Sequence, residues 1–173
     1  MQRAVIITSS GFRDEEFVYP YYRLLEADFS VDVATKDGQN AFGKFGVPAK
    51  ATKKTSDLRA SDYELCFIPG GLEAPDHVRS WPEVLSFIRD MDSQGKILAA
   101  ICHAPWVFIS AGIVKDRKMT AYWTMEADVK NSGAIYMHKE SVVIDKNMVT
   151  SPHYDDNPAF MKAVFELCKE NIR

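Results

Sequence analysis

Cys102 and His103 stand side by side at the end of an apolar run, and this pair is the strongest candidate for chemistry in the sequence. The predicted strand over 96–101 is almost wholly apolar, as expected of a central parallel strand that is covered on both faces. Ala100 and Ala104 lie two positions before and after the cysteine, where a sharp turn from strand to helix requires small side chains. The pattern predicts a nucleophile elbow with Cys102 at its apex.

The residues after Cys102 predict a short buried helix that would place the sulfur at a helix N-terminus. Pro105 suits a first helical turn, the apolar segment 106–109 follows, and Gly112 provides a stop. The partial positive charge of a helix N-terminus lowers the pKa of a thiol toward the reactive thiolate. The alternative is that Cys102 is only a small buried residue that ends a strand. The spacing alone leaves both interpretations open.

Strands and helices alternate along the chain according to the hydrophobic pattern. Apolar or alternating runs predict strands over 3–8, 29–35, 65–68 and 96–101. Amphipathic runs predict helices over 14–27, 81–92 and 157–171. A polar run predicts a further helix over 125–131, between short segments over 119–123 and 134–137. Turn residues predict hairpins over 37–48 and 141–150. We expect Pro20 to kink the first helix or shift its start, and we expect Leu25 and Ala159 on inward faces of their helices.

This alternation predicts an α/β fold, with a mostly parallel sheet and helices on both faces, in a single domain over 1–173. Ligands of such sheets bind outside the carboxyl ends of the strands. The loop 9–16, the Gly70-Gly71 pair and Cys102 all fall on that edge. The backbone N–H of Gly71 could join that of His103 to form an oxyanion hole, with a plain tight turn at the glycines as the alternative.

Composition and charge narrow the classes of function. A formal net charge of -3, with scattered Lys and Arg, argues against a nucleic-acid partner. No apolar run reaches bilayer length and the first residues lead directly into a strand, so we expect no membrane association and a cytoplasmic protein. Neither the histidines nor Cys66, Cys102 and Cys168 have metal-ligand spacing, so we expect no metal. No phosphate loop or G-x-G-x-x-G motif is present, so we expect no cofactor.

Several motifs together make the chain similar to the ThiJ/PfpI superfamily, whose members include intracellular cysteine proteases, glyoxalases and protein or nucleotide deglycases. They extend over nearly the whole chain and read EFVYPY at 16–21, FIPGG at 67–71, AICHAP at 100–105, TS at 150–151 and PAF at 158–160. The resemblance implies a flavodoxin-like three-layer sandwich, of the kind shared with class I glutamine amidotransferases. It also implies that Cys102 is the nucleophile.

The resemblance further assigns partners to Cys102. Glu16 matches the acidic partner, and because a protonated carboxyl can donate a hydrogen bond to a thiolate, we predict Glu16 largely protonated and Cys102 ionised at neutral pH. His103 matches the base of the protease-like members, although a histidine next to the nucleophile is expected to point away from its sulfur, and a structural role is the alternative. A third member from an adjacent subunit falls on Asp76, where the family has glutamate, and Glu73 looks like an insertion. The resemblance thereby implies a homo-oligomer, a dimer or a hexamer.

Three functional hypotheses follow. The first is a cofactor-independent cysteine enzyme that acts on small aldehydes such as methylglyoxal, or on their adducts with amines and thiols, as a glyoxalase or deglycase. The second is an intracellular peptidase or amidase with a peptide substrate. The third is a redox-sensing or chaperone-like stress protein with an oxidisable Cys102.

Three further residues are candidates for the site: Tyr122, Trp123 and His153. Loops after later strands could bring them over the cysteine, and the alternative is a core or interface position.

Overall fold

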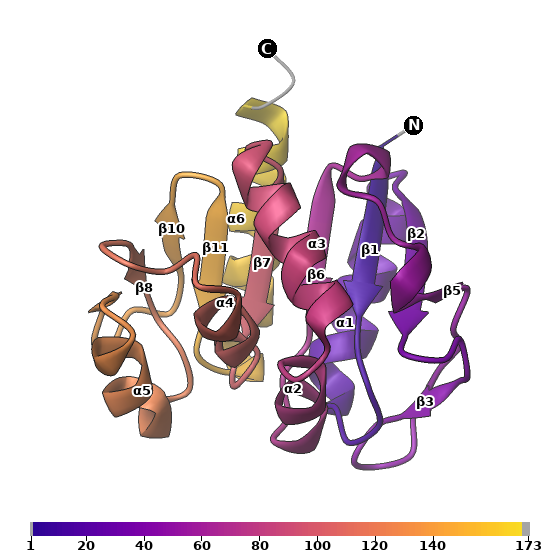
Figure 1. Ribbon diagram of the computed structural model, residues 1–173, viewed down its shortest axis with the longest axis horizontal. Coiled ribbons are helices and arrows are strands. Elements are labelled where there is room, and N and C mark those ends of the chain that lie inside the picture. The colour runs from indigo at the N-terminus through magenta and orange to yellow at the C-terminus, as the bar shows by residue number, and fades with distance from the viewer. Residues whose placement is uncertain (1, 171–173) are drawn as a thin grey trace.

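The fold is built around a seven-stranded sheet with the strand order β10-β11-β7-β6-β1-β2-β5. The computed structural model describes residues 2–170. All neighbouring strands are parallel except β10 and β11. In Figure 1 the arrows of β1, β2, β6 and β7 point toward the same lower edge. The bounds are β1 Arg3–Ile7, β2 Ser30–Thr35, β5 Lys53–Lys54, β6 Leu65–Ile68, β7 Ile97–Ile101, β10 Val143–Asp145 and β11 Met148–Ser151.

The central strands β6 and β7 are buried along their whole length, which explains their uninterrupted apolar sequences. Successive side chains of a strand point to opposite faces. Cys66 and Leu98, which are paired in register, therefore enter one core, whereas the next pair, Phe67 and Ala99, enters the other. Two separate cores on the two faces of one sheet define a three-layer sandwich.

Helices cover both faces of this sheet, as Figure 1 shows. Phe17 on α1 and Val164 on α6 belong to one core, and Ile88 on α3 and Phe108 on α4 belong to the other. The bounds are α1 Asp14–Glu26, α2 Glu73–Val78, α3 Pro82–Ser93, α4 Pro105–Ala111, α5 Glu126–Asn131 and α6 Asn157–Glu170. This arrangement confirms the predicted α/β architecture. None of the helices within residues 2–170 is long and apolar enough to cross a membrane.

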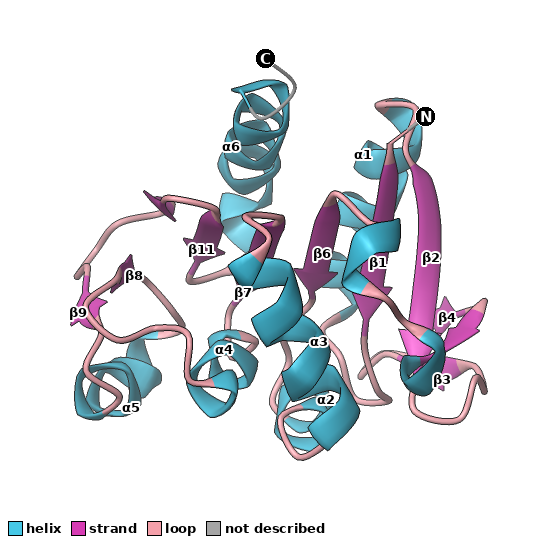
Figure 2. Ribbon diagram, turned by 45° about the horizontal axis from the view of Figure 1, so that its top comes forward, coloured by secondary structure: helices cyan, strands magenta, loops and turns pink. Residues whose placement is uncertain are grey.

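Two small two-stranded units lie outside the main sheet, at opposite ends of the molecule in Figure 2. β3 Ala41–Phe42 and β4 Pro48–Ala49 form an antiparallel hairpin, and β8 Lys118–Met119 pairs in parallel with β9 Ile135–Tyr136. Short 3-10 helices fill several connections: η1 Thr55–Asp57, η2 Ala60–Asp62, η3 Trp123–Met125 and η4 Tyr154–Asp156. The predicted hairpins over 37–48 and 141–150 are thus both present, with shorter strands than the turn signals suggested.

Some details of the sequence prediction are wrong. Of the two effects expected of Pro20, the shifted start is absent, because α1 begins at Asp14 with Pro20 inside it. Leu25 is 41% exposed, because the buried stripe of α1 runs through Leu24 and ends there. Ala159 is exposed in the first turn of α6, on the side away from the sheet, while Phe160 beside it is fully buried. The predicted end of this helix at 171 lies outside the described residues.

Candidate active site

The elbow predicted at Cys102 is present at the end of β7. Cys102 has a φ of 61°, the left-handed region that a residue with a side chain adopts only when its surroundings hold it there. Two backbone hydrogen bonds do so: the Cys102 N–H donates to the Ser151 carbonyl, and the Tyr122 N–H donates to the Cys102 carbonyl, each over 2.9 Å. Ala100 and Ala104 are fully buried on either side. The small side chains of Ala100 and Ala104 therefore allow close packing around the strained turn at Cys102, as the spacing predicted.

Gly70 and Gly71 follow β6 and touch the elbow directly. A Cβ atom on Gly70 would lie 2.5 Å from Glu16 Oε2 and 2.6 Å from Cys102 Cβ. Gly71 has a φ of +90°, and a Cβ there would meet the Gly11 carbonyl oxygen at 2.6 Å. Both positions therefore require glycine, and the absent side chains are what allow Glu16 and Cys102 to approach each other.

Replacing Gly70 with alanine tests this close approach. We expect G70A to lose about 1–3 kcal/mol of unfolding free energy, because the new methyl group overpacks a buried site. We also expect it to lower turnover by separating Glu16 from Cys102. Gly95→Ala is the matched control, since Gly95 has a φ of +67° and open space around it. It should lose stability through backbone strain without losing turnover, so a G70A enzyme that remains as active as G95A would contradict the packing argument.

Glu16 is a fully buried carboxyl group in the first turn of α1. Neither of its oxygens has a partner within hydrogen-bond geometry, although the Cys102 thiol and the Gly70 N–H lie near enough to lower its pKa. Burial outweighs these contacts and raises the pKa of Glu16 to about 7. Glu16 was predicted to be largely protonated at neutral pH; a pKa of about 7 makes it about half protonated there, so that it exchanges its proton near neutrality.

The predicted resting thiolate at Cys102 is wrong for this structure. Burial of the thiol, which is 7% exposed, and the charge of the Glu16 carboxylate both raise the pKa of Cys102. Hydrogen bonds from the backbone N–H groups of Gly71 and His103 lower the pKa without overcoming this. The site therefore does not store two negative charges. The resting Cys102 thiol keeps its proton, which must move onto the ionised form of Glu16 before the sulfur can attack.

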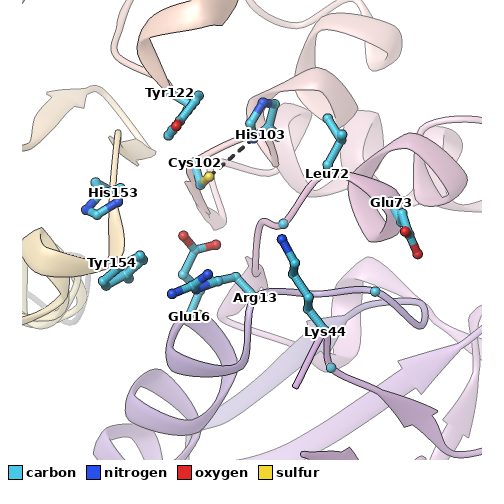
Figure 3. Close-up of a pocket in the computed structure, with 13 residues that line it drawn as sticks. Arg13, Glu16, Lys44, Leu72, Glu73, Cys102, His103, Tyr122, His153 and Tyr154 are labelled. Carbon is cyan, nitrogen blue, oxygen red and sulfur yellow. Dashed lines mark hydrogen bonds between the residues drawn. The ribbon is translucent and has the colours of Figure 1, made fainter. Parts of the chain in front are cut away.

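His103 faces the sulfur instead of pointing away from it. Its Nδ1 lies 3.3 Å from Cys102 Sγ (Figure 3). The strained backbone at Cys102 turns the following residue back toward the nucleophile, and the imidazole is held between Tyr122 and Trp106, at ring-centroid distances of 4.7 and 5.0 Å. Burial lowers the pKa of His103, so the ring is neutral near pH 7 and able to accept a proton.

A cavity of about 590 Å³ opens in front of this pair. Tyr122 and His153 line it, as the sequence suggested, whereas Trp123 does not. Arg13, Lys44 and Tyr154, which the sequence did not single out, also line it. Asp76 is exposed on α2 and is not among the residues that line it. The full lining is Gly11, Arg13, Glu16, Gly43, Lys44, Gly71, Leu72, Glu73, Cys102, His103, Tyr122, His153 and Tyr154. Figure 3 shows that these residues come from separate loops and helix ends, with Glu16, His103, Tyr122 and His153 nearest to Cys102.

Comparison with known proteins agrees with this geometry. The model of the DJ-1/PfpI family matches residues 2–167, and the chain belongs to that family. It is 34% identical to the protein named deglycase PfpI of Pyrococcus furiosus, covering 96% of this chain and 99% of that one. It is 36% identical to protein/nucleic acid deglycase 2 of Escherichia coli, covering 95% of each.

The fold is also that of solved structures in the family. The chain superposes with a TM-score of 0.93 and 31% identity on a two-domain protein from Anabaena variabilis, which contains DJ-1/ThiJ/PfpI-like and ferritin-like domains. The match covers 96% of this chain and 48% of that protein. The ThiJ/PfpI resemblance inferred from the motifs is therefore confirmed.

Proposed function

We propose that this protein is a cofactor-independent cysteine enzyme that removes reactive carbonyls from their adducts with thiols and amines, as a deglycase or glyoxalase. The observation that carries the proposal is the contact between the buried Glu16 carboxyl and the Cys102 thiol at a strained elbow. A carboxyl group with a pKa near 7 can both accept and return the thiol proton at neutral pH. The names of the relatives from Pyrococcus furiosus and Escherichia coli support the same reaction class.

The proposed reaction on a methylglyoxal adduct balances without an external oxidant. The adduct, a hemithioacetal, first releases its own thiol as its hydroxyl proton moves to the departing sulfur, which leaves methylglyoxal in the cavity. The Cys102 proton then passes to Glu16, and the Cys102 sulfur attacks the aldehyde carbon, whose oxygen becomes a hydroxyl as Glu16 returns the proton. Glu16 or His103 then removes the proton on that carbon and delivers it to the neighbouring ketone carbon, while the hydroxyl proton of the first carbon passes to the ketone oxygen. The first carbon is thereby oxidised to a Cys102 thioester and the second is reduced to an alcohol. Water cleaves the thioester, which releases lactate and restores the Cys102 thiol.

The Gly71 and His103 N–H groups are proposed to hold the oxyanion during attack. Both N–H groups already donate toward the Cys102 sulfur. They therefore lie next to the oxygen of any substrate carbonyl carbon that bonds to this sulfur. Tyr122 and His153 line the cavity beside them and are proposed to contact the substrate. The three cysteines, Cys66, Cys102 and Cys168, are free and buried, and we place this thiol chemistry in a reducing compartment such as the cytoplasm.

The test is turnover of the adduct formed by methylglyoxal and N-acetylcysteine. We expect stoichiometric release of lactate and free thiol by the purified protein, followed by enzymatic lactate assay and thiol titration. The control is the same incubation without protein, because such adducts also dissociate spontaneously to methylglyoxal. Release of thiol without lactate would contradict the proposed reaction, since it would show only that dissociation.

A peptidase or amidase is the second candidate, and the 3.3 Å approach of His103 Nδ1 to Cys102 Sγ favours it. In this reading Asp76 of a neighbouring copy completes the triad in a dimer or hexamer, because Asp76 of the same chain does not line the cavity. Light scattering would give the oligomeric state. Cleavage of a fluorogenic peptide that is lost in both Cys102→Ser and Asp76→Asn would support the peptidase, and unchanged cleavage in Asp76→Asn would exclude this triad.

A further inference from the structure

We propose that Lys44 is a substrate-binding residue that selects adducts carrying a carboxylate, so that the enzyme acts on carbonyl adducts of anionic thiols and amines. This inference rests on the proposed function and specifies its substrate class. Lys44 lines the same cavity as Cys102. Figure 3 shows its amine directed toward the part of the cavity beside the sulfur. Within residues 2–170, the amine forms no ion pair with a carboxylate.

The backbone that carries Lys44 is firmly anchored. The Lys44 N–H donates to the Phe12 carbonyl over 2.8 Å, which ties the tip of the β3–β4 hairpin to the loop before α1. The buried carboxylate of Asp14 accepts from the N–H groups of Phe45 and Val47, each over 2.9 Å. The hairpin therefore presents Lys44 to the cavity from a fixed position, so that binding an anion there costs little backbone ordering.

Gly43 is part of this anchor. A Cβ atom there would lie 2.5 Å from Asp14 Cγ, so only glycine allows the hairpin backbone to approach the Asp14 carboxylate this closely. The segment Gly43-Lys44-Phe45-Gly46 thus has a clear geometric role. Its glycines permit the turn and the close approach, and Lys44 is the residue that it delivers to the site.

The other charged groups of the cavity leave Lys44 as the available cation. The Arg13 guanidinium pairs with Glu15, at 2.7 and 3.0 Å, and lies over the Tyr154 ring at 4.4 Å. Glu16 is partly neutral at pH 7 because its pKa is about 7. The Glu73 carboxylate points away from Cys102 in Figure 3. A substrate carboxylate would therefore meet an uncompensated positive charge at Lys44.

The experiment compares two methylglyoxal adducts that differ by one charge, those of N-acetylcysteine and of N-acetylcysteine amide. We expect kcat/KM of the wild-type enzyme to be about three- to fivefold higher for the carboxylate, mainly through KM, as is typical of a partly exposed ion pair. Lys44→Met should abolish this preference and Lys44→Arg should retain it. Lys50→Met, at an exposed lysine outside the cavity, should behave as wild type.

A binding measurement separates this inference from the proposed reaction. The thioether N-acetyl-S-(2-oxopropyl)cysteine and its amide lack the aldehyde-derived hydroxyl carbon and cannot react, so calorimetry gives their Kd directly. Tighter binding of the carboxylate form to wild type, lost in Lys44→Met, supports the role of Lys44 even if neither adduct is turned over, in which case only the proposed reaction fails. Equal binding of the two forms, or a preference that survives in Lys44→Met, overturns the role of Lys44 even if both adducts are consumed.

Discussion

Replacing Cys102 with serine is expected to lower the turnover of the methylglyoxal adduct by roughly a thousandfold or more. A serine hydroxyl is far less acidic than a thiol, and a carboxylate with a pKa near 7 cannot remove its proton to any useful extent. The fold should persist, because oxygen replaces sulfur at a single buried position without changing the backbone. The measurement is lactate release under saturating adduct, with circular dichroism to confirm the fold.

Cys168→Ser is the matched control for this substitution. Cys168 is a buried free cysteine on α6 and lies outside the cavity. Its replacement should leave lactate release unchanged. If Cys102→Ser retained more than about a tenth of the wild-type rate, covalent catalysis by the elbow cysteine would be ruled out, since losing the nucleophile costs several orders of magnitude.

Replacing Glu16 with glutamine is expected to have opposite effects on activity and stability. Turnover should fall by about 10²–10⁴-fold, because an amide cannot accept the Cys102 proton. Stability should rise at neutral and alkaline pH. The raised pKa means that the folded state favours the protonated carboxyl, so this contribution is fully present below pH 4.5 and is lost as the pH rises through 7. A neutral glutamine avoids that loss.

The size of this effect follows from the shift between 4.5 and about 7. We expect the unfolding free energy of Glu16→Gln, relative to that of wild type, to rise by about 3 kcal/mol from pH 4.5 to pH 8. Urea unfolding at each pH measures both values. Glu140→Gln supplies the control, because Glu140 is exposed and, within residues 2–170, forms no ion pair. A pH-independent difference for Glu16→Gln would mean that the carboxyl is not held neutral by burial.

The features that could be predicted from the sequence are those that depend on neighbours along the chain. The apolar run before Cys102, the small residues around it and the glycine stop at Gly112 were sufficient to place β7, the elbow and α4. The same holds for the Gly70-Gly71 turn after β6. Motif resemblance then added Glu16, whose partner is remote in sequence. These predictions succeeded because backbone strain and strand burial restrict which residue types can occupy a position.

The features that could not be predicted depend on neighbours in space. The orientation of His103 is set by the Tyr122 and Trp106 rings, and only one of these is close in sequence. The raised pKa of Cys102 reflects how deeply the folded chain buries the thiol, which no local pattern encodes. The sequence shows Lys44 only as part of the predicted hairpin over 37–48, because its position at the cavity depends on contacts of the hairpin with Asp14 and the Phe12 carbonyl.

The two hydrogen bonds that hold the elbow come from Tyr122 and Ser151, both of which follow Cys102 in the chain. During synthesis, Cys102 leaves the ribosome well before the residues that strain it. Without them the left-handed conformation, which costs about 1–3 kcal/mol, has nothing to sustain it. The nascent chain therefore carries an ordinary, relaxed cysteine. The strained elbow is assembled only when β11 joins the sheet beside β7, so the catalytic geometry at Cys102 depends on a part of the chain that is synthesised later.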